Sequence, residues 1–234
     1  MRSRPASARA AALSDSKGVA DLAAHEPPLN CELCSRLAAF RVTNREREPQ
    51  WHNAPVASFG DTSASLLIVG LAPGVKGANR TGRPFTGDFA GDLLYATLLA
   101  HGFAQGSYAA STDDGLQLVG TRITNAVRCV PPENKPTPLE IATCRRYLEG
   151  TLAGMPALRA IVALGRIAHD SVLTTLGVRK SAFPFGHGRK HLLKPELALY
   201  DSYHCSRYNT NTGVLTPAMF NEVFATIRRD VSAS

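Results

Sequence analysis

The stretch LLIVGLAPGVKGANRTGRPFTGDFAGD, residues 66–92, begins as an apolar run and continues as a glycine-rich loop. The apolar run 66–71 is typical of a fully buried strand. Glycine lets a backbone approach a ligand closely, so several glycines in one loop suggest main-chain N–H groups turned toward an anionic or planar molecule. The loop also carries donors, an aromatic ring and a carboxylate, on Asn79, Arg80, Arg83, Phe85 and Asp88. We therefore expect a strand that ends in a binding loop.

Outward from this stretch, apolar runs alternate with longer segments of helical periodicity. Further strands are expected at 121–127, 160–164 and 197–203, and helices at 89–101, 138–152, 167–176 and 217–229. Two charged or polar stretches without periodicity are expected to be irregular, 41–54 and 106–115. Alternating strands and helices favour an α/β layered domain around a largely parallel sheet, whose ligand crevice lies at the carboxyl ends of the strands. The glycine loop, the segment 125–132 and the segment from His204 onward should meet there.

Length and composition indicate one globular domain at 26–234, preceded by a disordered basic tail at 1–25. The chain has 234 residues, of which 44% are apolar and 19% charged, which suits a substantial core. The tail resembles a transit peptide in composition but lacks the apolar core of a secretory signal, and no apolar run is long enough to predict a membrane span. We therefore expect a cytoplasmic protein. The net charge of +7 favours a polyanionic partner, although many basic proteins bind no nucleic acid.

Four cysteines form a candidate metal centre. Cys31 and Cys34 make a Cys-x-x-Cys pair, Cys129 lies in a proline-flanked loop, and Cys144 lies on a predicted helix. In a reducing compartment, cysteines are more often metal ligands or catalysts than disulfides. Their spacing matches neither a zinc ribbon nor a two-cluster ferredoxin. The residues alone therefore leave zinc, a [4Fe–4S] cluster and buried hydrophobic cysteines open.

Three segments together resemble the family 5 uracil-DNA glycosylases, the iron–sulfur branch of that superfamily: GLAPGVKGANRTGRPFTGD at 70–88, TNAVRCVPPENKPTP at 124–138 and SYHCSRYNTNTG at 202–213. The resemblance runs from about Cys31 to the final helix. It implies a three-layer α/β/α sandwich with a central, mainly parallel four-stranded sheet. It also implies a [4Fe–4S] cluster on Cys31, Cys34, Cys129 and Cys144.

The activity that the resemblance implies is that of a monofunctional DNA glycosylase acting as a monomer. Such an enzyme hydrolyses the N-glycosidic bond of uracil in double-stranded DNA, with single-stranded DNA as a further substrate form, and initiates base excision repair. Other deaminated or damaged bases, such as hypoxanthine and ethenocytosine, are expected substrates. No lysine is an obvious Schiff-base nucleophile, which argues against a lyase step.

Several residues of the three segments suit recognition of an extruded base. Phe85 would stack on uracil, and the Asn125 amide would meet its O4 and N3–H. His204 would donate a hydrogen bond to O2, where negative charge develops as the base departs. Main-chain N–H groups near Ala72 and Gly74 would add donors. Each has an ordinary alternative, namely a core aromatic, a strand-ending asparagine or a structural histidine.

Water activation falls to Asp88 by the same resemblance. Many relatives in the superfamily hold a polar residue near the start of the first segment, where this chain has Ala72, which cannot orient water. Asp88 is the nearest carboxylate and would position water or stabilise the oxocarbenium ion. The sequence fits equally well a role for Asp88 as N-cap of the helix that begins at Phe89. The two roles do not exclude each other.

The segment after His204 resembles the loop that enters the minor groove and fills the gap left by the extruded nucleotide. Its DNA-binding candidates are Ser206, Arg207, Tyr208 and Asn209, with Arg80, Arg83 and Arg207 as phosphate contacts or, alternatively, as solvated surface charges. Family members often have proline where this chain has Cys205. A Cys205–His204 nucleophile pair is not expected, because adjacent residues in a strand point to opposite faces.

Two other functions are compatible with parts of the sequence. One is a DNA-binding iron–sulfur protein without catalysis, which would use the same basic surface and cysteines. The other is a nucleotide-binding phosphoryl enzyme with phosphate in the glycine loop. The loop lacks the Gly-Lys-Ser/Thr ending of a P-loop, which argues against the second.

Overall fold

A six-stranded sheet forms the centre of the molecule, and its strand order is β1-β5-β2-β6-β8-β7. The computed structural model describes residues 26–232, so the tail expected at 1–25 lies outside the described residues. The four middle strands are parallel: β5 (Thr121–Asn125), β2 (Leu66–Gly70), β6 (Ala160–Leu164) and β8 (Leu197–Ser202). Antiparallel strands flank them at the two edges, β1 (Phe59–Gly60) and β7 (Lys190–Lys194). The expected four-stranded parallel sheet is confirmed as the middle of a wider, mixed sheet.

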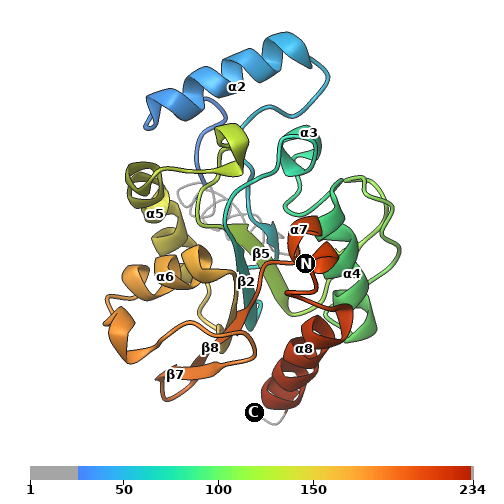
Figure 1. Ribbon diagram of the computed structural model, residues 1–234, viewed down its shortest axis with the longest axis vertical. Coiled ribbons are helices and arrows are strands. Elements are labelled where there is room, and N and C mark those ends of the chain that lie inside the picture. The colour runs from blue at the N-terminus through green and yellow to red at the C-terminus, as the bar shows by residue number, and fades with distance from the viewer. Residues whose placement is uncertain (1–25, 233–234) are drawn as a thin grey trace, which may run out of the picture.

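Helices cover both faces of this sheet and complete the three expected layers (Figure 1). One face is covered by α4 (Phe89–Ala100) and α8 (Pro217–Ser232), and the other by α5 (Pro138–Ala153) and α6 (Arg166–Thr175). Alternate residues of β2 enter the two cores: Leu66 and Ile68 pack on the first side, Leu67 and Val69 on the second. Burial on both faces explains why the strand is uniformly apolar and does not alternate with polar residues.

The expectation of irregular structure at 41–54 is wrong in its first half, because helix α2 (Ser35–Arg47) extends into this range. Only Leu37, Arg41 and Asn44 of α2 are buried, so the helix shows little apolar periodicity. Its polar contacts are tertiary: Arg41 Nη1 donates to the Cys31 carbonyl at 2.9 Å. The helix lies at one end of the molecule, beyond α3 and α5 (Figure 1). A periodicity criterion misses a helix that is held mainly by polar contacts.

The remaining elements are short and lie in the connections. They are α3 (Ala78–Thr81), α7 (Arg207–Asn211), 3₁₀ turns at Pro132–Asn134 and Lys180–Ala182, and a small hairpin of β3 (Ala104–Gln105) and β4 (Gln117–Leu118). The helices α4, α5, α6 and α8 agree with the sequence expectation to within three residues at each end. No helix within residues 26–232 has both the length and the apolar character required to cross a membrane.

Candidate active site

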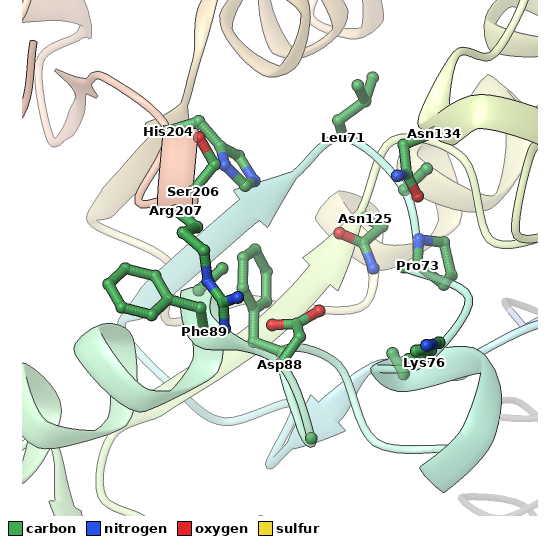
Figure 2. Close-up of a pocket in the computed structure, with 16 residues that line it drawn as sticks. Leu71, Pro73, Lys76, Asp88, Phe89, Asn125, Asn134, His204, Ser206 and Arg207 are labelled. Atoms are coloured by element: carbon green, nitrogen blue, oxygen red, sulfur yellow. The ribbon is translucent and has the colours of Figure 1, made fainter. Parts of the chain in front are cut away.

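A cavity of about 590 Å³ opens at the carboxyl ends of the parallel strands. The loops that follow β2, β5 and β8 meet around it, as the alternation of strands and helices predicts. Figure 2 shows Asp88, Asn125 and His204 directed into one common space from three different segments. The other candidates that line the cavity are Ala72, Gly74, Phe85, Ser206 and Arg207. The structure therefore brings together the residues expected to contact a base and a sugar.

Close approach at the end of β2 depends on Gly70. It pairs with Asn125 in the register of β2 and β5. A Cβ added at Gly70 would lie 2.4 Å from Asn125 Oδ1 and 2.6 Å from Cζ of Phe85. The Asn125 Oδ1 atom is buried and accepts no hydrogen bond from any described residue. A buried acceptor without a donor is costly, so this oxygen is suited to a ligand N–H.

His204 comes two residues after β8 and faces Phe85. The centroids of the two rings are 6.1 Å apart, and the ring planes are inclined by 31°. Burial lowers the pKa of His204, an effect that the negative charge of Asp88 opposes only in part. The imidazole is therefore neutral at physiological pH. The backbone behind it is held by Asn209, whose Nδ2 donates to the His204 carbonyl at 2.8 Å.

Asp88 is both a helix cap and a cavity residue. Its Oδ1 accepts a hydrogen bond from the Gly91 N–H at 3.1 Å and so caps α4, where the helix dipole favours negative charge. Its Oδ2 faces the glycine loop: a Cβ at Gly77 would lie 2.2 Å from that oxygen, and one at Gly74 would lie 3.0 Å away. The structure therefore shows the capping role and leaves the second oxygen beside the cavity.

The residues expected to bind DNA differ in their exposure and in the contacts that their side chains already make within the protein. Arg207 lines the cavity with its guanidinium 5.4 Å from the centre of the Phe89 ring, and Tyr208 is 75% exposed. Arg80 is exposed and donates through Nε to the Lys76 carbonyl. The side chains of Ser206 and Asn209 build the loop itself, because Ser206 Oγ accepts from the Asn209 N–H at 3.3 Å and caps α7.

Arg83 is not available to DNA, so its expected role as a phosphate contact is wrong. Its side chain is 5% exposed. Nη1 and Nη2 donate to the two carboxylate oxygens of Asp114 at 2.9 and 2.7 Å, and Nε donates to Thr86 Oγ1 at 2.7 Å. All three nitrogens of the guanidinium therefore donate hydrogen bonds to groups within the protein. A buried arginine cannot be told from an exposed one by its position in a polar loop.

The four cysteines line one small cavity formed by α2, the segment after β5 and α5. Burial and neighbouring thiols raise the pKa of Cys129 to about 12 and that of Cys144 to about 11. No three of the four sulfur atoms lie within 4.8 Å of one another. Four thiols around one cavity fit either a zinc ion or a [4Fe–4S] cluster. The Arg128 N–H donates to Cys144 Sγ at 3.3 Å, and Tyr147 Oη lies 3.6 Å from Cys31 Sγ.

Cys205 is separate from this set. It is fully buried, its Sγ donates to the Ala90 carbonyl at 3.4 Å, and burial raises its pKa to about 12. A buried thiol that stays protonated is a poor nucleophile. The structure therefore agrees with the expectation that Cys205 and His204 do not form a nucleophilic pair.

Comparison with known proteins identifies the family. The model described as "Uracil DNA glycosylase superfamily" matches residues 57–228. The chain belongs to the uracil DNA glycosylase superfamily. It is 49% identical over 205 residues to the type-5 uracil-DNA glycosylase of Thermus thermophilus, an alignment that covers 85% of this chain and 93% of the relative.

Other relatives place the chain among the type-5 members of the uracil DNA glycosylase superfamily. The type-5 protein of Pyrobaculum aerophilum is 39% identical over 199 residues, covering 83% of this chain and 86% of the relative. A type-4 uracil-DNA glycosylase, from Sulfurisphaera tokodaii, is 29% identical over 181 residues, an alignment that covers 74% of this chain and 75% of the relative. The resemblance found in the three sequence segments is confirmed.

Two polar side chains line the cavity of this superfamily member without having been expected from the sequence. Lys76 lines the cavity. That no lysine of the three segments serves as a Schiff-base nucleophile stays a prediction. Asn134 lines it as well, and its φ of 56° is left-handed, as is that of Glu133. Asparagine tolerates this conformation better than most residues, which is the one local signal in the sequence. Both positions were visible in the quoted segments, but nothing in their spacing showed that they face the cavity.

The Arg83–Asp114 pair generates a stability prediction. Hydrogen bonding to Arg83 lowers the pKa of Asp114 below the unfolded value of about 3.9. Its stabilisation is therefore present above that pH and declines as the pH falls toward the lowered pKa. Asp114→Asn should reduce the free energy of unfolding by about 3 kcal/mol at pH 7, because Arg83 would stay buried without its counter-charge. Urea unfolding measures this, and the difference from wild type should shrink below about pH 4.

Asp113→Asn is the matched control for that experiment. Asp113 is the exposed neighbour of Asp114 and bonds only locally, to Ser111. Its substitution should leave the unfolding free energy unchanged within about 0.5 kcal/mol. An equal loss for the two variants would show that the buried pair contributes nothing specific.

Proposed function

We propose that this protein is a uracil-DNA glycosylase that hydrolyses the N-glycosidic bond of an extruded uracil and leaves an abasic site, the first step of base excision repair. The observation that carries the proposal is the buried, unpaired Asn125 Oδ1 in a cavity that also contains His204 and Asp88. Its relatives named type-5 uracil-DNA glycosylases support it. The nucleotide must leave the helix before any of these groups can reach it.

Asn125 would distinguish uracil from cytosine. Its Oδ1 would accept from uracil N3–H while its Nδ2 donates to O4. Cytosine presents a bare N3 and an amino group at these positions, so both hydrogen bonds would be lost and Oδ1 would remain buried without a donor. Sites built on such paired hydrogen bonds discriminate strongly against the mismatched analogue. Phe85 would supply the stacking surface.

The leaving base and the sugar place opposite demands on the site. His204, neutral because it is buried, would donate to uracil O2 as negative charge collects on the base. The Oδ2 atom of Asp88 would face the sugar, orient the attacking water and stabilise the positive charge of the oxocarbenium ion. Ala72, which lines the same cavity, has no polar group for this task. Main-chain N–H groups near Ala72 and Gly74 would complete the contacts to the base oxygens.

The cavity volume supports a wider range of bases. At about 590 Å³ it exceeds what a pyrimidine ring needs. Hypoxanthine presents an N–H beside a carbonyl, as uracil does, and would satisfy the same Asn125 amide. We therefore include hypoxanthine among the proposed substrates. Ethenocytosine is included as well, because the cavity has room for a base larger than uracil. Arg80, Arg207 and Tyr208 would contact the DNA strand around the cavity mouth, in double-stranded or single-stranded substrates.

The four cysteines would hold a [4Fe–4S] cluster, whose contribution when bound is to join α2, α5 and the segment after β5. Ala72 lines the base cavity and also packs against the apolar group that includes Leu37 and Cys144. Cys129 follows Asn125 by four residues. The cysteine region and the base-recognition residues therefore share one piece of backbone.

Metal analysis tests the cluster. Protein purified without oxygen should be brown and contain iron and sulfide in fourfold amounts per chain. Cys129→Ser should lose most of this content, because a cysteine ligand is removed. Cys205→Ser, a change at the buried cysteine outside the set, should retain it. Colourless protein with one zinc per chain would rule the cluster out.

Excision on a labelled duplex tests the activity. A single uracil opposite guanine should be removed, and the strand should break only after alkali, as expected for a monofunctional enzyme. His204→Ala and Asp88→Ala should lower the single-turnover rate by about 10² to 10³-fold, because each removes a group that stabilises developing charge. Asp92→Ala changes an exposed carboxylate in the same helical turn and should leave the rate unaltered.

Two results would overturn parts of this proposal. No excision of uracil, hypoxanthine or ethenocytosine by cluster-replete protein would favour the DNA-binding iron–sulfur protein without catalysis. Strand cleavage without alkali, together with a borohydride-trapped complex that Lys76→Ala abolishes, would show a lyase step and refute monofunctionality. Equal loss of rate and of DNA affinity in the Asp88 and His204 variants would refute their catalytic roles.

A further inference from the structure

The backbone at Phe85 has an unusual conformation. Its φ is 53°, in the left-handed region that favours glycine and disfavours bulky residues. The residue is only 7% exposed, and it forms part of the cavity wall. Such a conformation persists only when surrounding contacts hold it, and it is often found at functional sites.

Two tyrosines and one glycine surround the backbone of this residue. Tyr95 Oη donates to the Pro84 carbonyl at 2.6 Å, and Tyr108 Oη lies 3.4 Å from both the Phe85 carbonyl and the Gly87 N–H. The two tyrosine rings stack with centroids 4.6 Å apart. A Cβ at Gly91 would lie 1.8 Å from the Phe85 oxygen, so the start of α4 packs directly on that carbonyl. The carbonyl groups of Pro84 and Phe85, before and after the Phe85 side chain, are therefore both held by contacts with neighbouring residues.

Behind the tyrosines lies the Arg83–Asp114 pair. The Arg83 guanidinium is 5.4 Å from the centre of the Tyr95 ring and 5.8 Å from that of Tyr108, distances at which a cation attracts an aromatic face. Asp114 also accepts from the Ala109 N–H at 2.9 Å and from the Leu116 N–H at 3.1 Å. One carboxylate thus shapes the loop 106–115 and binds the arginine beside Phe85. That loop lies outside the three segments that carry the family resemblance.

We propose that Tyr108 is a positioning residue for base recognition: with the Arg83–Asp114 pair behind it, Tyr108 holds Phe85 in the left-handed conformation that presents its ring to the extruded base. The inference rests on the proposed function. Tyr108 acts through Phe85 and does not itself line the cavity. Loss of its hydroxyl lets the Phe85 peptide relax, so the ring meets the base less favourably. The effect falls on base binding more than on bond cleavage, because stacking is present before and during the reaction.

The experiment compares affinities for two duplexes. One contains a single 2′-fluoro-deoxyuridine, which is not hydrolysed, opposite guanine, and the other contains only normal pairs. Tyr108→Phe keeps the ring stack and removes only the hydroxyl, and it should lower the preference for the first duplex about fivefold, the size of one hydrogen bond. Affinity for the normal duplex should not change. Tyr200→Phe is the matched control, because its hydroxyl bonds Asp230 at 2.6 Å and lines a different cavity.

A double-mutant cycle separates positioning from a general structural effect. In a Phe85→Ala background, Tyr108→Phe should cause no further loss of preference, because the ring that it positions is gone. The same fivefold loss in both backgrounds would overturn the inference. Asp114→Asn should weaken the preference as Tyr108→Phe does, and if that variant fails to fold, the Tyr108 cycle decides alone.

The outcomes also separate this inference from the function on which it rests. Wild-type protein that prefers the uracil analogue, together with a Tyr108→Phe variant that retains the full preference, would overturn the positioning role and leave the glycosylase proposal intact. Wild-type protein with no such preference and no excision would overturn both.

Discussion

The absence of a side chain at Gly70 is the constraint on which the cavity depends. The space that a Cβ would occupy is taken by the Asn125 amide oxygen and the Phe85 ring. Those two groups come from different segments, one at the end of β5 and the other in the loop after β2, and they meet only because β2 ends in a residue without a side chain. The neighbouring residues of β2 are buried on both faces, so the sheet cannot shift to relieve an added atom. The proposed base-recognition surface is therefore a direct product of how the sheet ends.

The charged and titratable groups around Gly70 differ in their environments. Asp88, whose carboxylate lines the cavity, lies at a helix N-terminus, where negative charge is favoured. The imidazole opposite is kept neutral by burial. An ion pair, Arg83 with Asp114, lies outside the cavity and supports the loop that carries Phe85. A carboxylate thus lies on the cavity wall, and a buried ion pair lies behind that wall.

The cysteine region is coupled to the cavity by continuous backbone. The residues after Asn125 extend the pairing with β2: the Ala126 N–H donates to the Gly70 carbonyl, and the Val127 N–H donates to that of Leu71, both at 2.9 Å. Cys129 follows two residues after Val127. A group that joins the cysteines would therefore stabilise the same segment that carries the Asn125 amide. In this arrangement the cysteines would affect the proposed recognition through the backbone, without touching a substrate.

The sequence by itself determined the alternation of strands and helices, the parallel middle of the sheet and the family. Apolar runs such as Leu66–Val69 and motif segments are local patterns, and local patterns can be read along a chain. Asp88, Asn125 and His204 could be placed in one site because the carboxyl ends of parallel strands share an edge. Only the tertiary structure decided that Arg83 is buried against Asp114, that α2 is a helix, and that Lys76 and Asn134 face the cavity. Each of these depends on which distant residue fills the space beside a side chain, a relation that sequence spacing does not contain.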